Sequence, residues 1–337
     1  MTVAALETPS TGFARRAHGR MDAWTELGMD VSNSASATQA LKAAHMLDWN
    51  VRLMGNVTAT ANDIDENGVT THTVEMPDVR ATVRTNPVTG KTEYLGNVGR
   101  RYTPIQIDEH VDVLDLMAKE SGATLHRAGA YQGGSKFFLS MTLPQTLRIG
   151  GVDEHNMHLA LFGSHDGSSS NSFHIAPTRL DCGNMQRIFI KGAKHSYSIP
   201  HTASAAVKMA EVHKALTTLF GYQDAFEREA ERMLNTPLSL GQFEKVVHTI
   251  WPEKAAPTAR MRANTEARMS TLRTLFESAA TQENIRGTAW AGWNAIGEYL
   301  DHFAPARNSL RAARSLADTG AVAKRKTEAY NLFALAA

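Results

Sequence analysis

Two segments of the sequence alternate apolar and polar residues on both sides of a short turn. These segments, residues 79–98 and 124–143, contain the turn sequences Asn-Pro-Val-Thr-Gly and Gln-Gly-Gly-Ser. Alternation with a period of two predicts half-buried strands, and short turns of this composition join strands into β-hairpins. Between the hairpins, helical spacing starts at Asp108, a good N-cap, and stops at Gly122. Hairpins interrupted by helices, without βαβ repeats, predict an α+β fold with a central antiparallel sheet.

The pattern changes after residue 202 from alternating runs to helical spacing. We expect four parts: a flexible N-terminal arm (1–20), an α+β core domain (21–202), a mostly helical C-terminal region (203–304) and a basic Ala/Arg-rich tail (305–337). Separate helices are expected over residues 203–220, 224–234, 238–251, 265–278 and 287–302, with a linker over 252–264. Residues 57–75 are rich in Thr and Asn, which predicts a loop or a weak strand.

Composition restricts the class of protein. The chain has 337 residues, of which 42% are hydrophobic and 20% charged, as is typical of a soluble globular protein. Because the formal net charge is only +1, any nucleic-acid-binding surface must be a local patch. The single cysteine, Cys182, excludes an internal disulfide framework and fits a reducing cytosol. No stretch resembles a signal peptide or a membrane span, so we expect a cytoplasmic protein.

A dense set of polar side chains falls between residues 157 and 202. Within it, the sequence SHDGS (164–168) reads as a turn in which Gly167 can adopt a positive φ. Weak candidates for a catalytic site are His165, Asp166, Cys182 and His201. With Arg179 they suggest, as an alternative, an enzyme acting on a nucleotide or a nucleic-acid phosphodiester, which requires these side chains within about 4 Å of one another. The simpler interpretation is a buried thiol that only packs, beside satisfied turn residues.

The sequence lacks the motifs of common cofactor and metal sites. It contains no phosphate-binding GxxxxGK[ST] loop, no dinucleotide-binding GxGxxG between a strand and a helix, and no HExxH pair. Five residues within twenty positions have the composition of a metal cluster: His155, His158, His165, Asp166 and His174. Their spacing puts them on alternating faces of two strands, where they do not converge. We therefore expect neither a metal nor a cofactor.

Cationic residues beside aromatic ones suggest a nucleic-acid-binding surface. Lysine and arginine bind phosphates while aromatic rings stack on unpaired bases, a combination that suits single-stranded DNA. The residues expected to form this surface are Arg100, Arg101, Tyr102, Lys136, Arg179, Arg187, Lys191, Lys194 and Tyr197. The two tyrosines would stack on bases and the cations would bind phosphate. For any single cation, the alternative is a solvated position or a structural ion pair.

Several longer motifs carry a family resemblance. They are AWTELG (23–28), ALKAAHMLDWNV (40–51), YLGNVGRRYTPIQ (94–106), SHDGS (164–168), PTRLDCGNM (177–185), IPHT (199–202) and GTAWAGWNAIGEYLDH (287–302). Together they resemble the phage/plasmid-like protein family, a family of domains of unknown function found in actinobacterial phages and plasmids. Where that family reads Val-Cys-x-Asn-Thr, this sequence has Asp181-Cys-Gly-Asn-Met185, which keeps the cysteine and asparagine but lacks the hydroxyl.

The family resemblance implies a mobile-element setting and no particular mechanism. By analogy of fold, the chain is similar to ring-forming single-strand annealing proteins, in which hairpins and helices line a positively charged groove. This analogy implies a protein that binds and anneals single-stranded DNA as a homo-oligomer, such as a ring, in recombination or replication, with no membrane partner. The C-terminal helices and the apolar NLFALAA segment (331–337) would then contact other subunits or partners. A further alternative is a non-catalytic interaction protein, which an exposed apolar patch would favour.

Overall fold

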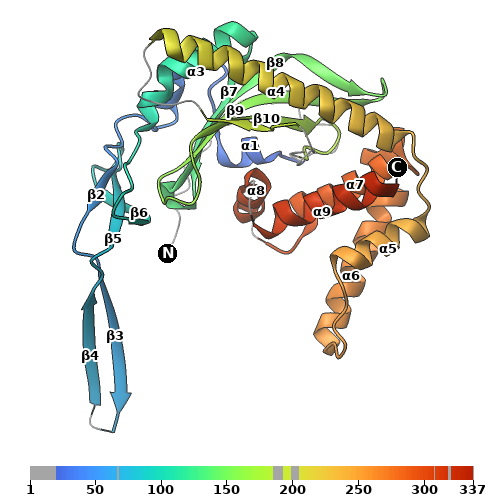
Figure 1. The fold of residues 1–337 in the computed structure, drawn as a ribbon. Coiled ribbons are helices and arrows are strands. Elements are labelled where there is room, and N and C mark those ends of the chain that lie inside the picture. Colours follow the sequence, from blue (N-terminus) through green and yellow to red (C-terminus); the bar gives the residue numbers. More distant parts are fainter. Residues whose placement is uncertain are drawn as a thin grey trace.

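The computed structural model describes residues 20–66, 68–184, 193–198, 205–306, 308–317 and 320–336. Its centre is a six-stranded antiparallel sheet (Figure 1). In spatial order the strands are β1 (Met29–Asp30), β7 (Thr124–Tyr131), β8 (Lys136–Ile149), β9 (Asp153–Ser164), β10 (Ser172–Arg179) and β11 (Ser196–Tyr197). The expected hairpin over 124–143 is β7–β8, joined by the 3₁₀ segment η2 (Gln132–Gly134). This sheet, with helices packed on it, confirms the α+β prediction.

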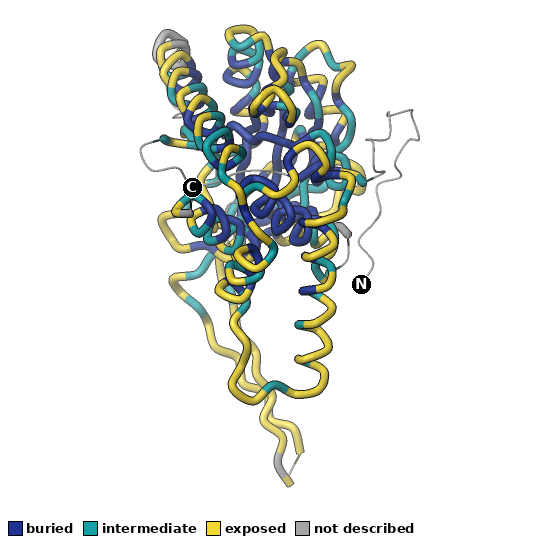
Figure 2. Tube along the Cα trace, turned by 90° about the vertical axis from the view of Figure 1, so that its right-hand side faces the viewer, coloured by how far each residue is buried: buried dark blue, intermediate teal, exposed yellow. Residues whose placement is uncertain are grey.

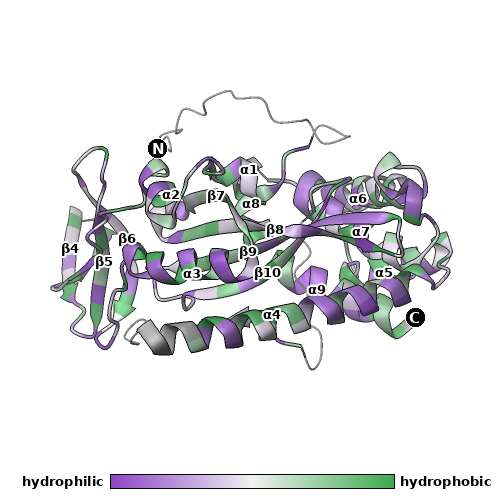
Figure 3. Ribbon diagram, turned by 90° about the horizontal axis from the view of Figure 1, so that it is seen from above, coloured by the Kyte–Doolittle hydropathy of each residue, from purple (hydrophilic) through white to green (hydrophobic). Residues whose placement is uncertain are grey.

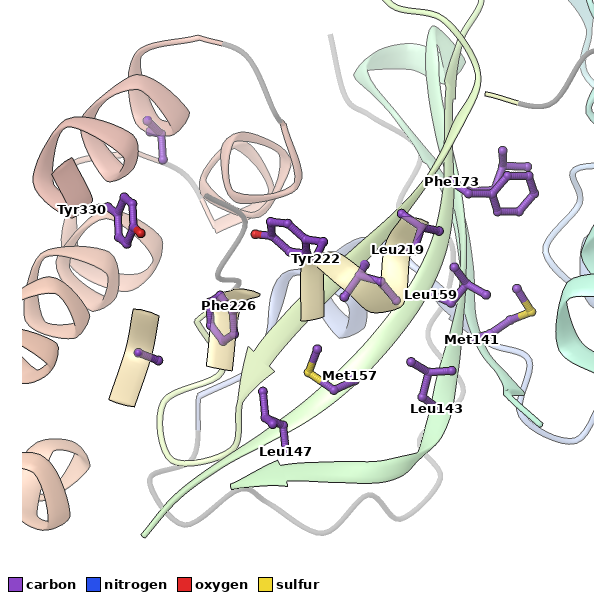
Figure 4. Packing of buried hydrophobic residues seen from close by; sticks show 14 of the residues in the cluster. Met141, Leu143, Leu147, Met157, Leu159, Phe173, Leu219, Tyr222, Phe226 and Tyr330 are labelled. Atoms are coloured by element: carbon purple, nitrogen blue, oxygen red, sulfur yellow. The ribbon is translucent and has the colours of Figure 1, made fainter. Parts of the chain in front are cut away.

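One face of the sheet packs against the long helix α4 (Ala205–Leu234). Side chains alternate between the two faces along a strand, so β9 directs every second residue toward this helix. Met157 and Leu159 of β9 are fully buried there, and Figure 4 shows them in one cluster with Tyr222 of α4. The same core includes helix α3 (Val111–Ser121), which follows the 3₁₀ segment η1 (Ile107–His110), and the short helix α2 (Ala37–Ala43).

The opposite face of the sheet is covered by short helices from the two ends of the described chain. Phe162 of β9 packs there in a second apolar cluster with Trp24 of α1 (Ala23–Leu27) and Leu316 of α8 (Asn308–Leu316). Helices α1 and α8 also contact each other. Segments nearly 300 positions apart therefore share one core layer beneath the sheet.

Two smaller β-structures extend from the core. Strands β2 (Arg52–Met54), β5 (Val79–Thr85) and β6 (Thr92–Gly99) form a three-stranded sheet, and β5–β6 is the hairpin predicted over 79–98. Residues 57–75, expected to be a loop or a weak strand, form an antiparallel ribbon of β3 (Thr58–Asp65) and β4 (Gly68–Glu75). The ribbon projects away from the molecule (Figure 1), and Figure 2 shows its described residues as exposed.

The C-terminal region is helical, as predicted, but several boundaries differ. Two helices were expected over residues 203–234, but α4 is one continuous helix that passes through Gly221. The next residue, Tyr222, has a fully buried ring that holds this part of the helix against the core. α5 (Leu240–Ile250) is followed by α6 (Ala259–Glu277), which begins inside the expected linker because the Thr258 hydroxyl accepts the Met261 N–H and caps it. The remaining elements are η3 (Ala280–Ile285), α7 (Ala289–Glu298) and its π-helical extension Tyr299–Phe303. Seen from above, α4 runs from the end with the three-stranded sheet toward the end with α5 and α6 (Figure 3).

The expected basic tail, residues 305–337, folds into α8 and α9 (Ala321–Ala336). Phe333, in the segment predicted to contact other subunits, is fully buried and stacks on Phe243 of α5 with ring centroids 6.3 Å apart. Phe333 therefore packs within its own chain, and the prediction that this residue contacts other subunits is wrong. Leu335 of the same segment is 86% exposed. Among the described residues, no helix has both the length and the apolar character needed to span a membrane.

Candidate functional site

The predicted turn between β9 and β10 lies at one end of the sheet and is held by its own polar groups. The Asp166 carboxylate accepts hydrogen bonds from the Ser168 N–H (3.0 Å) and from the Lys136 ammonium (3.3 Å). Gly167 has φ of 73°, as the sequence predicts for this position. Burial tends to raise the pKa of Asp166, but the hydrogen bonds from Ser168 and the charge of Lys136 outweigh it, so the pKa lies below its ordinary value. Asp166 is therefore ionised at neutral pH.

The end of strand β6 packs directly on this turn. A Cβ atom on Gly96 would lie 2.5 Å from Cβ of Asp166, so only glycine allows the two backbones to approach this closely. The Tyr102 hydroxyl donates to the Ser164 carbonyl at 3.4 Å. Arg100 and Arg101 precede this tyrosine and are exposed; Arg100 makes only a solvent-exposed pair with Asp78. The structure thus brings Arg100, Arg101 and Tyr102 to the same end of the sheet as Lys136, which lies 34 positions after Tyr102 in the sequence.

A cavity of about 640 Å³ opens beside the turn, between the sheet and helices α8 and α9. One part of its lining is apolar and includes Phe162 and Leu316. The polar part includes Lys136, Asp166, Ser168, Ser169, Ser170, Ser172, His174, Arg314 and Arg325. Three cations against one carboxylate, with several hydroxyls and an apolar wall, suit an anionic ligand that has an apolar portion.

Sequence reasoning missed Arg314 and Arg325, since both lie in the segment interpreted as a tail. The signal that would have found Arg314 is the amphipathic spacing of α8, in which Ala312, Ala313 and Leu316 are buried while Arg314 is exposed. No comparable signal identifies Arg325, whose guanidinium also lies 5.7 Å from the ring of Trp251.

Arg179, predicted to bind phosphate, is instead fully buried at the opposite end of β10. Its Nε donates to Oδ1 of Asp153 at 2.6 Å, and its Nη1 donates to the Thr281 carbonyl at 2.6 Å. The other carboxylate oxygen of Asp153 accepts from the Trp290 indole, also at 2.6 Å. The phosphate-binding prediction is wrong for Arg179, because its guanidinium is shielded from solvent and joins the sheet to the C-terminal helices.

Two further predicted DNA-binding residues, Tyr197 and Lys194, do not line the cavity. Tyr197 pairs with Phe173 on the α4 side of the sheet, where its hydroxyl donates to Glu211 at 2.7 Å. Lys194 is exposed near the same sheet edge. Arg187 and Lys191 lie outside the described residues.

The proposed catalytic constellation is divided between the two ends of the sheet. His165 follows the last residue of β9 and stacks on Phe137, with ring centroids 5.1 Å apart. Cys182 lies 3.8 Å from Arg179, which pairs with His155 near the start of β9. At about 3.3 Å per strand residue, roughly 30 Å separates these groups, so the 4 Å condition fails among the described residues. His201 lies outside them, and burial raises the pKa of Cys182, which keeps the thiol protonated.

The histidines of the imagined metal cluster also point in different directions. His155 lies against Phe226 and Trp290 on the α4 side, whereas His158 lies against Trp24 on the other face. In the part of the chain that the structure describes, no three His, Cys, Asp or Glu side chains are grouped closely enough to hold a metal ion.

Acidification is expected to destabilise the protein through His165. Burial, assisted by the charge of Arg84 and opposed by that of Asp166, lowers the pKa of His165 from 6.5 to about 4. The unfolded chain therefore takes up a proton near pH 6.5 that the folded protein accepts only near pH 4. The stability contributed by neutral His165 is complete above this window and is lost as pH falls through it. At ~1.4 kcal/mol per pKa unit, the loss is roughly 3 kcal/mol.

The measurement is the free energy of unfolding between about pH 7 and pH 4 for the unmodified protein and for His165→Phe. On acidification, His165→Phe should lose roughly 3 kcal/mol less of its free energy of unfolding than the unmodified protein. His72, whose side chain is 56% exposed on the ribbon, provides the control His72→Gln, which should follow the unmodified protein. An unchanged pH slope in His165→Phe would show that the acid sensitivity originates elsewhere.

Comparison with known proteins adds a family assignment. A family model described as a domain of unknown function (DUF932) matches residues 94–321. The matched segment contains the β9–β10 turn, Lys136, Arg179 and most of the C-terminal helices, while the β3–β4 ribbon lies before it. No curated protein and no solved structure matches the chain. Since the model covers more than half of the sequence, the chain belongs to the DUF932 family of domains of unknown function.

Proposed function

We propose that this protein binds single-stranded DNA and acts as an oligomer in strand annealing or recombination for a phage or plasmid. The observation that carries the proposal is the grouping of Arg100, Arg101, Tyr102 and Lys136 at the end of the sheet, beside the cavity that Arg314 and Arg325 also line. The motif resemblance to phage/plasmid-like proteins supports the mobile-element setting, and with it a host cytoplasm.

The chemistry of this surface supports a single strand over a duplex. Exposed arginines attract a phosphate backbone without reading its sequence. The half-buried ring of Tyr102 and the apolar wall of the cavity offer surfaces against which an unpaired base can stack. Bases in a duplex are already stacked on one another and do not reach such a wall.

Neutralising two cations of this surface is expected to weaken DNA binding and reduce its salt dependence. In Arg100→Gln with Arg101→Gln, loss of two phosphate contacts should reduce the slope of log K against log salt by about 1.4, since each contact on a single strand contributes about 0.7. The measurement is a salt titration of fluorescence anisotropy with a labelled oligonucleotide. Arg314→Gln should weaken binding further, because Arg314 lines the cavity.

The matched control is Lys42→Gln with Lys119→Gln. Both lysines are exposed; Lys42 belongs to α2 and Lys119 to α3. Neither lysine lines the cavity. This double variant removes the same total charge, so it should bind almost as well as the unmodified protein. Equal weakening in both double variants would mean that DNA senses only total charge, and failure of the unmodified protein to bind at low salt would overturn the proposal.

A non-catalytic interaction protein remains the second candidate, and the β3–β4 ribbon favours it. Ile64 is 80% exposed and its cross-strand partner Val69 is 63% exposed, at the tip of an arm that projects from the molecule (Figure 1). Exposed apolar side chains on such an arm are typical of a contact with another macromolecule.

A further inference from the structure

The β3–β4 ribbon lacks a structural partner within the part of the chain that the structure describes. Its eight cross-strand pairs form a separate two-stranded sheet, and all eight residues of β4 are exposed. A two-stranded hairpin alone is marginally stable in water and usually needs a third strand or a packed helix. An arm of this length is therefore expected to be covered by another molecule.

The charge of the ribbon restricts the kind of surface that can cover it. Residues 58–75 contain four acidic residues and no lysine or arginine. Asp63 is exposed and pairs with His72, which is also exposed, at 3.2 Å. At the tip, Ile64 and Val69 form an exposed apolar pair. A complementary surface would be positively charged and flat enough to approach the threonine-rich strands.

Such a surface is found on the N-terminal half of α6. No residue from 252 to 268 is buried, and this segment carries four Lys or Arg residues against two acids. Arg260 and Arg262 are both exposed, and Arg262 donates only to the nearby Pro257 carbonyl at 2.7 Å. Beside these cations, Ala259, Ala263 and Ala267 recur every fourth residue, are exposed, and leave room for a strand to approach.

The ribbon and α6 of one copy cannot meet each other. They lie at opposite ends of the molecule (Figures 1 and 3), while both project from the same side of the central sheet (Figures 1 and 2). An acidic arm at one end and a basic helix at the other are complementary only between copies. A contact between two different surfaces of identical chains is heterologous, and it generates a ring if the rotation closes or a filament if it does not.

We propose that the β3–β4 ribbon of one copy docks on the exposed N-terminal half of α6 of a second copy. The inference rests on the self-association included in the proposed function, but not on DNA binding. This contact would join the subunits head to tail. It would also give a role to the β3–β4 ribbon, which precedes the matched family region.

Charge reversal on each side of the contact tests this pairing. The ribbon variant is Asp63→Lys with Glu66→Lys, and the helix variant is Arg260→Glu with Arg262→Glu; all four side chains are exposed, so both variants should fold. Light scattering of the full chain, without DNA and over a range of concentrations, reports the mass of the assembly. We expect the unmodified protein to assemble, and each variant alone to assemble roughly 100-fold more weakly, because like charges then face each other.

Mixing the two variants is the decisive step. The basic ribbon of the first variant complements the acidic helix of the second, while the second variant's acidic ribbon complements the first variant's basic helix. An equimolar mixture should therefore regain the mass of the unmodified assembly. The charge-reversed control Lys42→Glu with Lys119→Glu changes exposed residues on α2 and α3 and should assemble normally.

Each of the following results would overturn the inference. They are an unmodified protein that stays monomeric, an assembly that neither variant weakens, and variants whose mixture fails to reassemble. Loss of assembly in the ribbon variant alone would also overturn it, since the ribbon would then meet a surface other than α6. A monomer that still binds DNA through Arg100 and Arg101 would reject this contact and leave the DNA-binding proposal intact.

Discussion

Replacing Asp153 by Asn is expected to lower the free energy of unfolding by about 3–5 kcal/mol. Asp153 and Arg179 are both fully buried, and each carboxylate oxygen of Asp153 accepts one hydrogen bond, from Arg179 and from the Trp290 indole. Asparagine keeps the shape but removes the negative charge and turns an amide NH₂ toward one of the two donors. The buried guanidinium would then keep only the more distant, partly exposed Asp181 carboxylate, 3.7 Å from its Nη2, as a counter-charge. Losing the close buried partner costs far more than loss of an exposed ion pair.

Urea unfolding followed by circular dichroism measures this change. Asp78→Asn is the matched control, because Asp78 also pairs with an arginine, Arg100, but is 80% exposed; it should change stability by no more than about 0.5 kcal/mol. The double replacement Asp153→Leu with Arg179→Met should cost less than Asp153→Asn, since it removes both charges. A loss below about 1 kcal/mol in Asp153→Asn would contradict the buried ion pair.

Replacing Phe333 by Ala is expected to cost about 3–5 kcal/mol, the usual effect of removing a buried aromatic ring. Phe333 of α9 is fully buried and stacks on Phe243, so its loss leaves a cavity between α9 and α5. The neighbouring change Leu335→Ala serves as the control, because Leu335 is 86% exposed and should change stability by no more than about 0.5 kcal/mol.

The comparison of these two variants also tests the fold of the segment expected to be a tail. Both changes truncate an apolar side chain, and the positions are two residues apart. If α9 packs as described, thermal unfolding separates the two variants clearly. If the segment were only a solvated tail, both variants would unfold like the unmodified protein.

The elements predicted correctly are those determined by local pattern. The hairpins β5–β6 and β7–β8 follow from alternation and turn composition, both of which act over a few residues. Residues 305–337 were predicted to be a basic tail because of their many Ala and Arg residues, with an apolar end that contacts other subunits. Burial of Phe333 depends instead on Phe243 of the same chain, some ninety positions earlier. Whether such a segment folds depends on its tertiary packing, which amino-acid composition does not reveal.

The candidate site was predicted in part for the same reason. Arg100, Arg101, Tyr102 and Lys136 were identified as cations beside aromatics, but only the fold shows that they lie at the same end of the sheet. Arg179 was assigned to that surface because a sequence does not reveal which cations are buried. Its partners, Asp153 and the Thr281 carbonyl, are 26 and 102 positions away.

The motifs that carry the family resemblance pair with one another in space. YLGNVGRRYTPIQ packs on SHDGS where Gly96 meets Asp166, and PTRLDCGNM meets GTAWAGWNAIGEYLDH where the Asn184 side chain donates to the Asn294 carbonyl. The first junction borders the cavity and the second joins the sheet to the helices. Each motif of a pair therefore supplies half of a contact within the fold.

The position of α8 and α9 has a consequence for synthesis on the ribosome. The sheet is complete once β11 has been translated, but the wall of the cavity, with Arg314 and Arg325, comes from helices made more than a hundred residues later. Until then, the apolar layer around Trp24 and Phe162 lacks its cover and is a natural substrate for a chaperone. A nascent chain of this protein therefore gains this cavity only after α8 and α9 have been made.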